Sequence, residues 1–273
     1  MSRIAGRFAD LKRAGRAALV PYITAGDPGK DATVPLMHAL VAAGADAIEL
    51  GVPFSDPSAD GPVIQAACER ALKAGTTLTD VLAMVREFRR SDAATPVILM
   101  GYLNPVEAMG AEAFAAAAAA AGVDGVITVD MPPEEADPLV GLLHKQGIDP
   151  IFLLAPTTDA ARVRRISETA SGFVYYVSFK GVTGAARLDV DEVRTRLAAV
   201  RRETSLPVGV GFGVRDAASA AALAKVADAV IVGSAVVSWL AEHRGDGPGA
   251  AAALGGFVRE LRRAMDAARG VSA

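Results

Sequence analysis

Three carboxylates lie close together in residues 48–65, which read IELGVPFSDPSADGPVIQ. Glu49 stands near the end of an apolar run, and Asp56 and Asp60 lie in the following loop, which is rich in Pro, Gly, Ser and Asp. No Lys or Arg falls between Glu49 and Cys68 to neutralise them. Two carboxylates in the same site differ in pKa when one of them is less hydrated. Glu49 and Asp60 could therefore serve as an acid and a base.

Each of these acids also has a purely structural interpretation. Glu49 could be a strand-end acid in water or in a salt bridge. Asp60 precedes Gly-Pro and could be a turn residue or the cap of a helix that begins at Pro62. Asp56 is interpreted as a structural residue or as a contact with a partner. The pairing of Glu49 with Asp60 favours the catalytic interpretation.

Three glycine-bearing loops follow three successive apolar runs near the C-terminus: KGVTGA at residues 180–185, GFGV at 211–214 and VGSAV at 232–236. Glycines let backbone N–H groups approach an anion, and a helix starting near Ser234 would add its dipole. Each glycine alone could instead serve a turn, but three such loops together predict a phosphate site. Neither GxxxxGK[ST] nor GxGxxG before a suitable acid is present, which disfavours a nucleoside triphosphate or a dinucleotide.

A set of apolar and aromatic residues lies at or just past the ends of apolar runs. Side chains in such positions can line a pocket for a flat ring, although each could equally belong to the core. They are Tyr22, Met100, Ile127, Tyr175 and Phe212.

Metal and nucleophile chemistry have little support. His38, His144 and His243 are scattered without metal-ligand spacing and are interpreted as surface residues. Cys68 is interpreted as a core residue in a helix, and no GxSxG motif occurs. Lys180 is disfavoured as a Schiff-base lysine because such a residue normally projects from a strand end.

The predicted strands and helices that carry these residues alternate along the chain. Eight β-rich runs, each followed by a helical pattern, read ALVPYIT, AIEL, PVILMGY, GVITVD, PIFLL, FVYYV, PVGVG and AVIVG. Their continuous apolar character is typical of strands buried on both faces, as in a parallel sheet. Three helix-to-strand turns resemble one another: AGADAIEL, AGVDGVIT and KVADAVIV. The pattern predicts a (β/α)₈ TIM barrel, with catalytic groups at the C-terminal ends of the strands. A doubly wound open sheet is the alternative.

Two further helices are expected outside the eight repeats. One precedes the first strand and carries Ile4, Phe8 and Leu11 on one face. The other spans residues 249–268, with apolar residues at helical spacing. The Ala-rich run AFAAAAAAAG predicts a helix that ends at Gly122. No domain boundary is visible, so residues 1–273 are predicted to form a single domain.

Bulk properties exclude several classes of protein. The formal net charge of −3 argues against a role at nucleic acids or membrane surfaces. The one cysteine excludes an intrachain disulfide and is consistent with the cytoplasm. No signal peptide and no membrane span are expected.

Six motifs carry a resemblance to a known family. They are IELGVPFSDPSADGPVIQ, PYITAGDP, VILMGYLNPV, VDMPPEE, FVYYVSFKGVTGA and VGFGV. In order and spacing, over nearly the whole chain, the sequence resembles the tryptophan synthase alpha chain family. The resemblance implies a TIM-barrel lyase that cleaves indole-3-glycerol phosphate to indole and glyceraldehyde 3-phosphate in tryptophan biosynthesis.

The resemblance also implies roles for residues. Glu49 would protonate indole C3, and Asp60 would accept a hydrogen bond from the ring N–H and stabilise the cation. Which carboxylate takes the proton of the glycerol hydroxyl stays open. Thr183 would be a lid residue that closes toward Asp60. The phosphate would lie on Gly184, Gly213, Gly233 and Ser234, and the indole among Tyr22, Ile64, Met100, Ile127, Tyr175 and Phe212.

A partner is implied as well. The family works with a beta chain that holds pyridoxal 5′-phosphate (PLP), in an alpha2-beta2 heterotetramer, and no cofactor is expected in this chain. Pro53, Asp56, Asn104 and Pro132 match positions at the beta-chain contact. We expect the isolated chain to be monomeric.

The sequence departs from the family pattern at the lid and in the pocket. Phe179 and Lys180 stand where a basic residue followed by a small one is frequent, and Tyr22 and Met100 replace the commoner Phe and Leu. The lid, residues 180–188, must open for substrate. Three alternatives remain: a stand-alone indole-glycerol-phosphate lyase, a sugar-phosphate isomerase or epimerase on the same barrel, and a weakly active subunit that mainly activates a beta chain.

Overall fold

Parallel strands and helices alternate along the chain in the computed structural model, which describes residues 2–177, 189–211, 213–243 and 249–271. The strands are β1 (Ala18–Thr24), β2 (Ile48–Gly51), β3 (Val97–Gly101), β4 (Gly125–Thr128), β5 (Asp149–Ile151), β6 (Leu153–Leu154), β7 (Val174–Tyr176), β8 (Val208–Val210) and β9 (Ala229–Val232). They form one sheet in the order β5-β4-β3-β2-β1-β9-β8-β7-β6. Every pair is parallel, as the apolar runs predict.

The sheet closes on itself through β5 and β6. These two strands stand at the two ends of the strand order, but only Phe152 separates them along the chain. β5 pairs with β4 and β6 with β7, and the N–H of Tyr175 donates to the carbonyl of Phe152 at 3.0 Å. The predicted single run PIFLL is therefore one continuous extended stretch, which pairs with β4 in its first half and with β7 in its second half. The barrel prediction is confirmed, and the open-sheet alternative is wrong.

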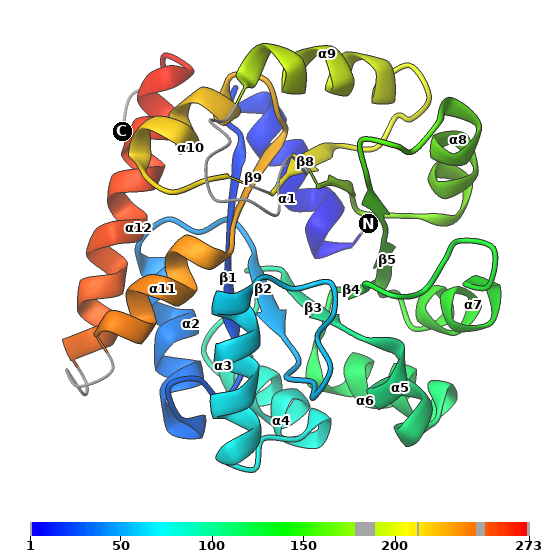
Figure 1. Ribbon diagram of the computed structural model, residues 1–273, viewed down its shortest axis with the longest axis vertical. Helices are drawn as coiled ribbons and strands as arrows, with labels where there is room; N and C mark the ends of the chain where they lie inside the picture. Colours follow the sequence, from blue (N-terminus) through cyan, green and yellow to red (C-terminus); the bar gives the residue numbers. More distant parts are fainter. Residues whose placement is uncertain (1, 178–188, 212, 244–248, 272–273) are drawn as a thin grey trace.

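Helices surround the strands (Figure 1). Their bounds are α1 (Arg3–Arg13), α2 (Thr33–Ala42), α3 (Pro62–Lys73), α4 (Leu78–Phe88), α5 (Leu103–Met109), α6 (Ala111–Ala121), α7 (Asp137–Lys145), α8 (Ala160–Thr169), α9 (Val190–Val200), α10 (Ala217–Ala224), α11 (Ser234–Glu242) and α12 (Gly249–Ala268), with a 3₁₀ turn at Lys30–Ala32. The extra helices α1 and α12 are confirmed. The Ala-rich helix α6 ends at Gly122, whose φ of 87° is left-handed.

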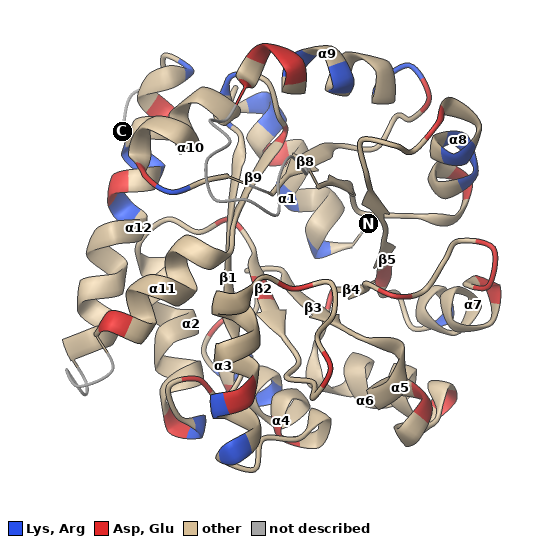
Figure 2. Cartoon of the chain, in the orientation of Figure 1, with Lys and Arg blue, Asp and Glu red and all other residues tan. Residues whose placement is uncertain are grey.

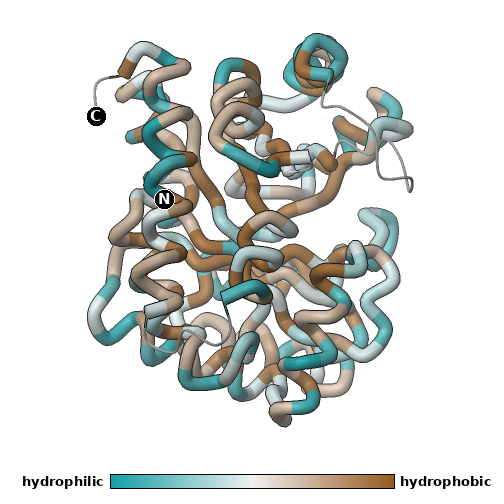
Figure 3. Tube along the Cα trace, turned by 60° about the vertical axis from the view of Figure 1, so that its left-hand side comes forward, coloured by the Kyte–Doolittle hydropathy of each residue, from teal (hydrophilic) through white to brown (hydrophobic). Residues whose placement is uncertain are grey.

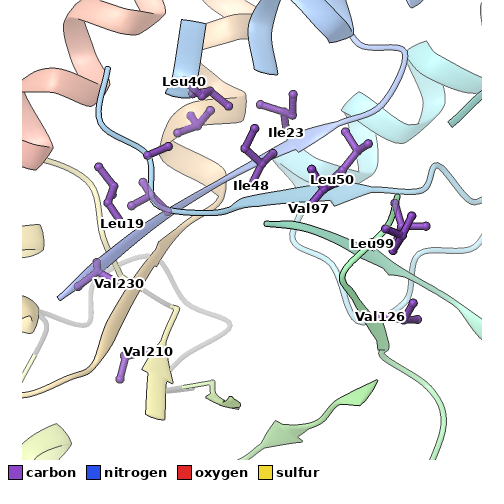
Figure 4. Close-up of a cluster of buried hydrophobic side chains, with 14 of the residues drawn as sticks. Leu19, Ile23, Leu40, Ile48, Leu50, Val97, Leu99, Val126, Val210 and Val230 are labelled. Atoms are coloured by element: carbon purple, nitrogen blue, oxygen red, sulfur yellow. The ribbon is translucent and has the colours of Figure 1, made fainter. Parts of the chain in front are cut away.

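The outward side chains of the strands pack against these helices. Leu19 and Ile23 of β1 and Ile48 and Leu50 of β2 belong to this layer, and Leu40 reaches them from α2 (Figure 4). Successive side chains of a strand point to opposite faces, so the residues between them face into the barrel. Glu49 is therefore directed inward.

Helix α1 closes the end of the barrel at which the strands begin. Its apolar face, Ile4, Phe8 and Leu11, packs with inward side chains such as Ile98 and Phe173. The rings of Phe8 and Phe173 lie 5.5 Å apart. This packing leaves the other end of the barrel, where the strands finish, for chemistry.

Charge and hydropathy are separated radially. Lys, Arg, Asp and Glu lie mainly on the outer helices and loops, whereas the strands are almost free of them (Figure 2). The hydrophobic stretches of the trace gather in the strands and on the inner faces of the helices (Figure 3). Within the described ranges, no helix combines the length and apolar character that crossing a membrane requires.

A buried ionic cluster joins α12 to the starts of β1 and β2. The guanidinium of Arg262 donates to Asp46 Oδ2 and to the Ala17 carbonyl, at 3.0 and 2.9 Å, and to Asp266 on its own helix. Asp46 Oδ2 also accepts the N–H of Leu19 at 2.9 Å. The cluster therefore fixes the C-terminal helix α12 to the first two strands, β1 and β2.

Replacing Arg262 by Ala would leave Asp46 and Asp266 buried with fewer partners. Loss of one member of such a pair costs about 3–5 kcal/mol of unfolding free energy. We expect a loss of this size for Arg262→Ala in urea denaturation. The neighbouring Arg263 is exposed, so Arg263→Ala is the control and should change stability by less than about 0.5 kcal/mol. Equal losses in the two variants would contradict the role given to the cluster.

Candidate active site

Two inward residues lie side by side near the ends of β1 and β2. Tyr22 and Glu49 are register partners, and Glu49 is in turn opposite Ile98 of β3. The apolar residues Ile48 and Leu50 on either side of Glu49 face the helices, which forces its carboxyl group into the barrel. The sequence places an acid at this position, and the alternation of the strand decides where it points.

The carboxyl group of Glu49 is buried and lacks a cationic partner among the residues that the structure describes. Glu49 is 1% exposed, and its Oε2 atom has no hydrogen-bond partner within the described residues. Burial, followed by the nearby charge of Asp60, raises the pKa of Glu49 from 4.5 to about 8. The interpretation of Glu49 as a solvated or salt-bridged strand end is wrong, because burial removes its water and no described ion pair includes it.

Asp60 lies in the loop between β2 and α3 and faces Tyr102. Its Oδ2 accepts the Tyr102 hydroxyl at 2.8 Å. The N-cap residue of α3 is Gly61, and no side chain caps this helix, so the capping interpretation of Asp60 is also wrong. Burial raises the pKa of Asp60, while the hydrogen bond from Tyr102 opposes that rise.

Tyr102 is a site residue that the sequence motifs did not predict. This residue is the N-cap position of α5 and follows directly on β3. Its hydroxyl also accepts the N–H of Ala59 at 3.0 Å, and its ring stacks on Phe54, with centroids 5.1 Å apart. The available signal was its place just past the strand end, where it stands in the motif VILMGYLNPV.

Two tyrosines occupy the barrel mouth above two glycines. A Cβ atom at Gly51 would lie 2.0 Å from the hydroxyl oxygen of Tyr22, and one at Gly211 would lie 2.1 Å from that of Tyr175. Any larger residue at these glycines would displace the rings. The Tyr22 hydroxyl is 3.2 Å from Thr24 Oγ1, which satisfies it in a buried position.

The apolar pocket residues gather around these rings. Ile64 and Met100 pack with Tyr22, and Ile127 belongs to the same inward cluster as Tyr175. Five of the six predicted ring contacts are thus brought to one mouth. Phe212 lies outside the described residues, as do Phe179, Lys180, Thr183 and Gly184 of the predicted lid and phosphate loop.

The start of α11 borders the same pocket. Gly233 is its N-cap residue, Ser234 is its first residue, and no side chain caps it. A Cβ at Gly233 would lie 3.8 Å from Ile64 and 4.0 Å from Tyr22. The first N–H groups of a helix have no intrahelical partner and favour an anion. Gly213, with φ of 76°, has a left-handed conformation in the neighbouring loop.

The predicted partner contacts differ in exposure. Asp56 and Asn104 are exposed and Pro132 is half-buried, whereas Pro53 is buried within the chain and offers little surface. In the part of the chain that the structure covers, no cluster of three His, Cys, Asp or Glu side chains could hold a metal ion.

Comparison with known proteins adds a family to this geometry. A family model described as the tryptophan synthase alpha chain matches residues 8–266. The tryptophan synthase alpha chain of Thioalkalivibrio sulfidiphilus is 65% identical over 266 residues, which cover 97% of this chain and 100% of that protein. The corresponding chain of Nitrosococcus oceani is 61% identical and covers 99% and 100%.

Solved structures agree with these sequence relationships. The tryptophan synthase alpha subunit of Legionella pneumophila superposes with a TM-score of 0.91 at 44% identity, covering 98% of this chain and 99% of that one. A structure of Mycobacterium tuberculosis tryptophan synthase gives a TM-score of 0.87 at 40% identity, covering 97% and 98%. The chain therefore belongs to the tryptophan synthase alpha chain family, a TIM-barrel lyase that catalyses the alpha reaction, the retro-aldol cleavage of indole-3-glycerol phosphate to indole and glyceraldehyde 3-phosphate.

Proposed function

We propose that Glu49 is the acid that starts this cleavage by protonating indole C3. The observation that carries the proposal is its buried carboxyl group, whose pKa of about 8 keeps it protonated at neutral pH. A general acid works best when its pKa is near the working pH. A resident Lys or Arg would lower that pKa and weaken the acid.

Asp60 would stabilise the cation that protonation creates. Protonation at C3 places positive charge on the ring nitrogen, and a carboxylate that accepts the ring N–H lowers the energy of that state. A base then removes the proton of the hydroxyl next to the ring, the C–C bond breaks, and its electron pair restores the aromatic ring. We assign this proton to Glu49, because a carboxylate with a raised pKa is the stronger base.

Substrate binding would use the two other features of the mouth. The phosphate would accept hydrogen bonds from the backbone N–H groups of Gly184 and Gly213 and, at the start of α11, from those of Gly233 and Ser234. The indole ring would lie among Tyr22, Ile64, Met100, Ile127, Tyr175 and Phe212, with Thr183 on the lid. The buried tyrosines and the uncapped helix support this assignment.

We also propose the assembly in which the chain works. The partner is a beta chain that holds PLP, in an alpha2-beta2 complex, while this chain carries no cofactor of its own. The exposed Asp56 and Asn104 support a contact along the loop after β2 and the start of α5, with Pro132 and Pro53 beside it. We place the protein in the cytoplasm and residues 1–273 in one domain, since α12 packs on α2 at the other end of the chain.

The rival activities lack comparable support. A sugar-phosphate isomerase would have no use for the buried aromatic mouth, and family membership favours a subunit over a stand-alone lyase. Tight binding of indole propanol phosphate would support the lyase.

Glu49→Gln and Asp60→Asn test the two roles. The first removes the proton donor and the second the negative charge, and both keep the shape of the side chain. We expect indole release to fall by at least about 100-fold in each, with the far-ultraviolet circular dichroism spectrum unchanged. Near-normal turnover of either variant would remove that residue from the mechanism.

The protonation of Glu49 has a separate signature in stability. The unfolded chain loses this proton near pH 4.5, but the folded chain keeps it until about pH 8. The folded state therefore binds more protons in this window, and its stability falls as pH rises. Glu49→Gln should remove that loss, so its stability relative to the original chain should grow by on the order of 3 kcal/mol between pH 5 and pH 8.

Urea denaturation at the two pH values measures this difference. The control is Glu112→Gln, since Glu112 is exposed on α6. The control should shift stability equally at both pH values. An equal shift for Glu49→Gln would mean that Glu49 is ionised in the folded protein at pH 8 and pH 5 alike.

The partner is tested by indole release with and without a beta chain. We expect slow release by the purified chain, greatly accelerated when beta chain is added. Solution scattering should show a monomer without it. Fast release by the chain alone would favour the independent lyase, and no release in either case would favour the isomerase.

A further inference from the structure

Tyr102 lies between the loop that carries Asp60 and the start of α5, and its hydroxyl bonds to that loop at two points. We propose that Tyr102 is a positioning residue of the cleavage reaction, which holds the Asp60 carboxylate so that one oxygen is directed to the ring N–H of the substrate. This inference rests on the role proposed for Asp60.

The direction of the two hydrogen bonds is fixed by chemistry. The backbone N–H of Ala59 can only donate, so the Tyr102 oxygen accepts it, at 3.0 Å. The hydroxyl has a single hydrogen, which is left for Asp60 Oδ2 at 2.8 Å. The Tyr102 hydroxyl is thus an acceptor on one side and a donor on the other, and Asp60 is held as an acceptor.

The other groups of Asp60 show what this bond leaves available. Its N–H donates to the Pro57 carbonyl at 3.0 Å, and its carbonyl accepts Gln65 Nε2 at 2.9 Å, so its backbone is fixed on both sides. Among the described residues only Tyr102 donates to the carboxylate, and it uses Oδ2. Oδ1 remains as the oxygen that can accept a ring N–H.

Tyr102 is itself well placed to fix a direction. It is 5% exposed, it begins α5, and its ring stacks on Phe54 with an interplanar angle of 28°. A buried tyrosine whose ring is already stacked loses little entropy when its hydroxyl is used. Tyr102 therefore sets the orientation of Asp60 from the end of the neighbouring strand, β3.

The bond also acts on the charge of Asp60. Burial raises the pKa of Asp60, and the donated hydrogen bond lowers it, because donation favours the ionised carboxylate. Burial, followed by the hydrogen bond to Asp60 and the charge of Asp60, raises the pKa of Tyr102, so its hydroxyl keeps its hydrogen across the working range. Without Tyr102, Asp60 would take up a proton at higher pH.

The test is Tyr102→Phe, which keeps the ring and its stacking and removes only the hydroxyl. Indole release from indole-3-glycerol phosphate is measured from pH 5 to pH 9 with the full chain, with and without beta chain. We expect kcat at neutral pH to fall about tenfold, the size of effect of a lost hydrogen bond to a charged group. The acid limb of the kcat profile should move to higher pH, and KM should change less than kcat.

Phe54→Leu is the matched control. It removes the stacked ring and keeps the hydroxyl, so a merely structural role of this corner would affect both variants alike. We expect the acid limb of Phe54→Leu to stay where it is in the original chain. The same shift in both variants would overturn the inference, and so would an unchanged kcat and pH profile in Tyr102→Phe.

Asp60→Asn separates this inference from the function on which it rests. An inactive Asp60→Asn variant with an unaltered Tyr102→Phe profile would disprove the role of Tyr102 and keep that of Asp60. A near-normal Asp60→Asn variant would disprove the role of Asp60, and with it this inference. Thermal unfolding midpoints of Tyr102→Phe and Phe54→Leu show whether either variant is merely unfolded.

Discussion

The chemistry of the barrel mouth follows from the buried carboxyl group of Glu49, which has no cationic partner within the described ranges. Glu49 is directed inward because its neighbours Ile48 and Leu50 are needed on the outer face of β2. Its burial keeps it protonated, and that state survives only where Lys and Arg are kept away. The lack of basic residues between Glu49 and Cys68 agrees with this electrostatic requirement.

The same mouth needs glycines for reasons of space. The rings of Tyr22 and Tyr175 extend across the positions that Cβ atoms of Gly51 and Gly211 would take. These inward glycines let two large side chains enter a barrel whose interior is otherwise filled by packed side chains. Gly233 serves a different purpose, since it leaves the start of α11 without a side-chain cap beside the pocket.

Stability and chemistry are placed at opposite ends of the barrel. At the end where the strands begin, α1 fills the interior and Arg262 joins α12 to Asp46 in a buried ionic cluster. At the other end, polar groups such as Glu49 Oε2 are left without a partner among the described residues, at a cost in free energy. Because the end of the barrel where the strands begin is closed and firmly packed, the opposite end can carry unpaired polar groups.

The strands, the two extra helices and the identity of the acids could be predicted from the amino-acid sequence alone. Apolar runs and helical spacing predicted these elements to within a few residues, because both patterns are local. The roles offered for Glu49 and Asp60 as a salt-bridged strand end and a helix cap were also local, and both were wrong. Three features could be known only from the folded chain: Tyr102 contacts Asp60, Tyr22 covers Gly51, and β5 and β6 form one continuous stretch that pairs with β4 and then with β7. Each of these depends on segments far apart in the chain, which come together only when the barrel closes.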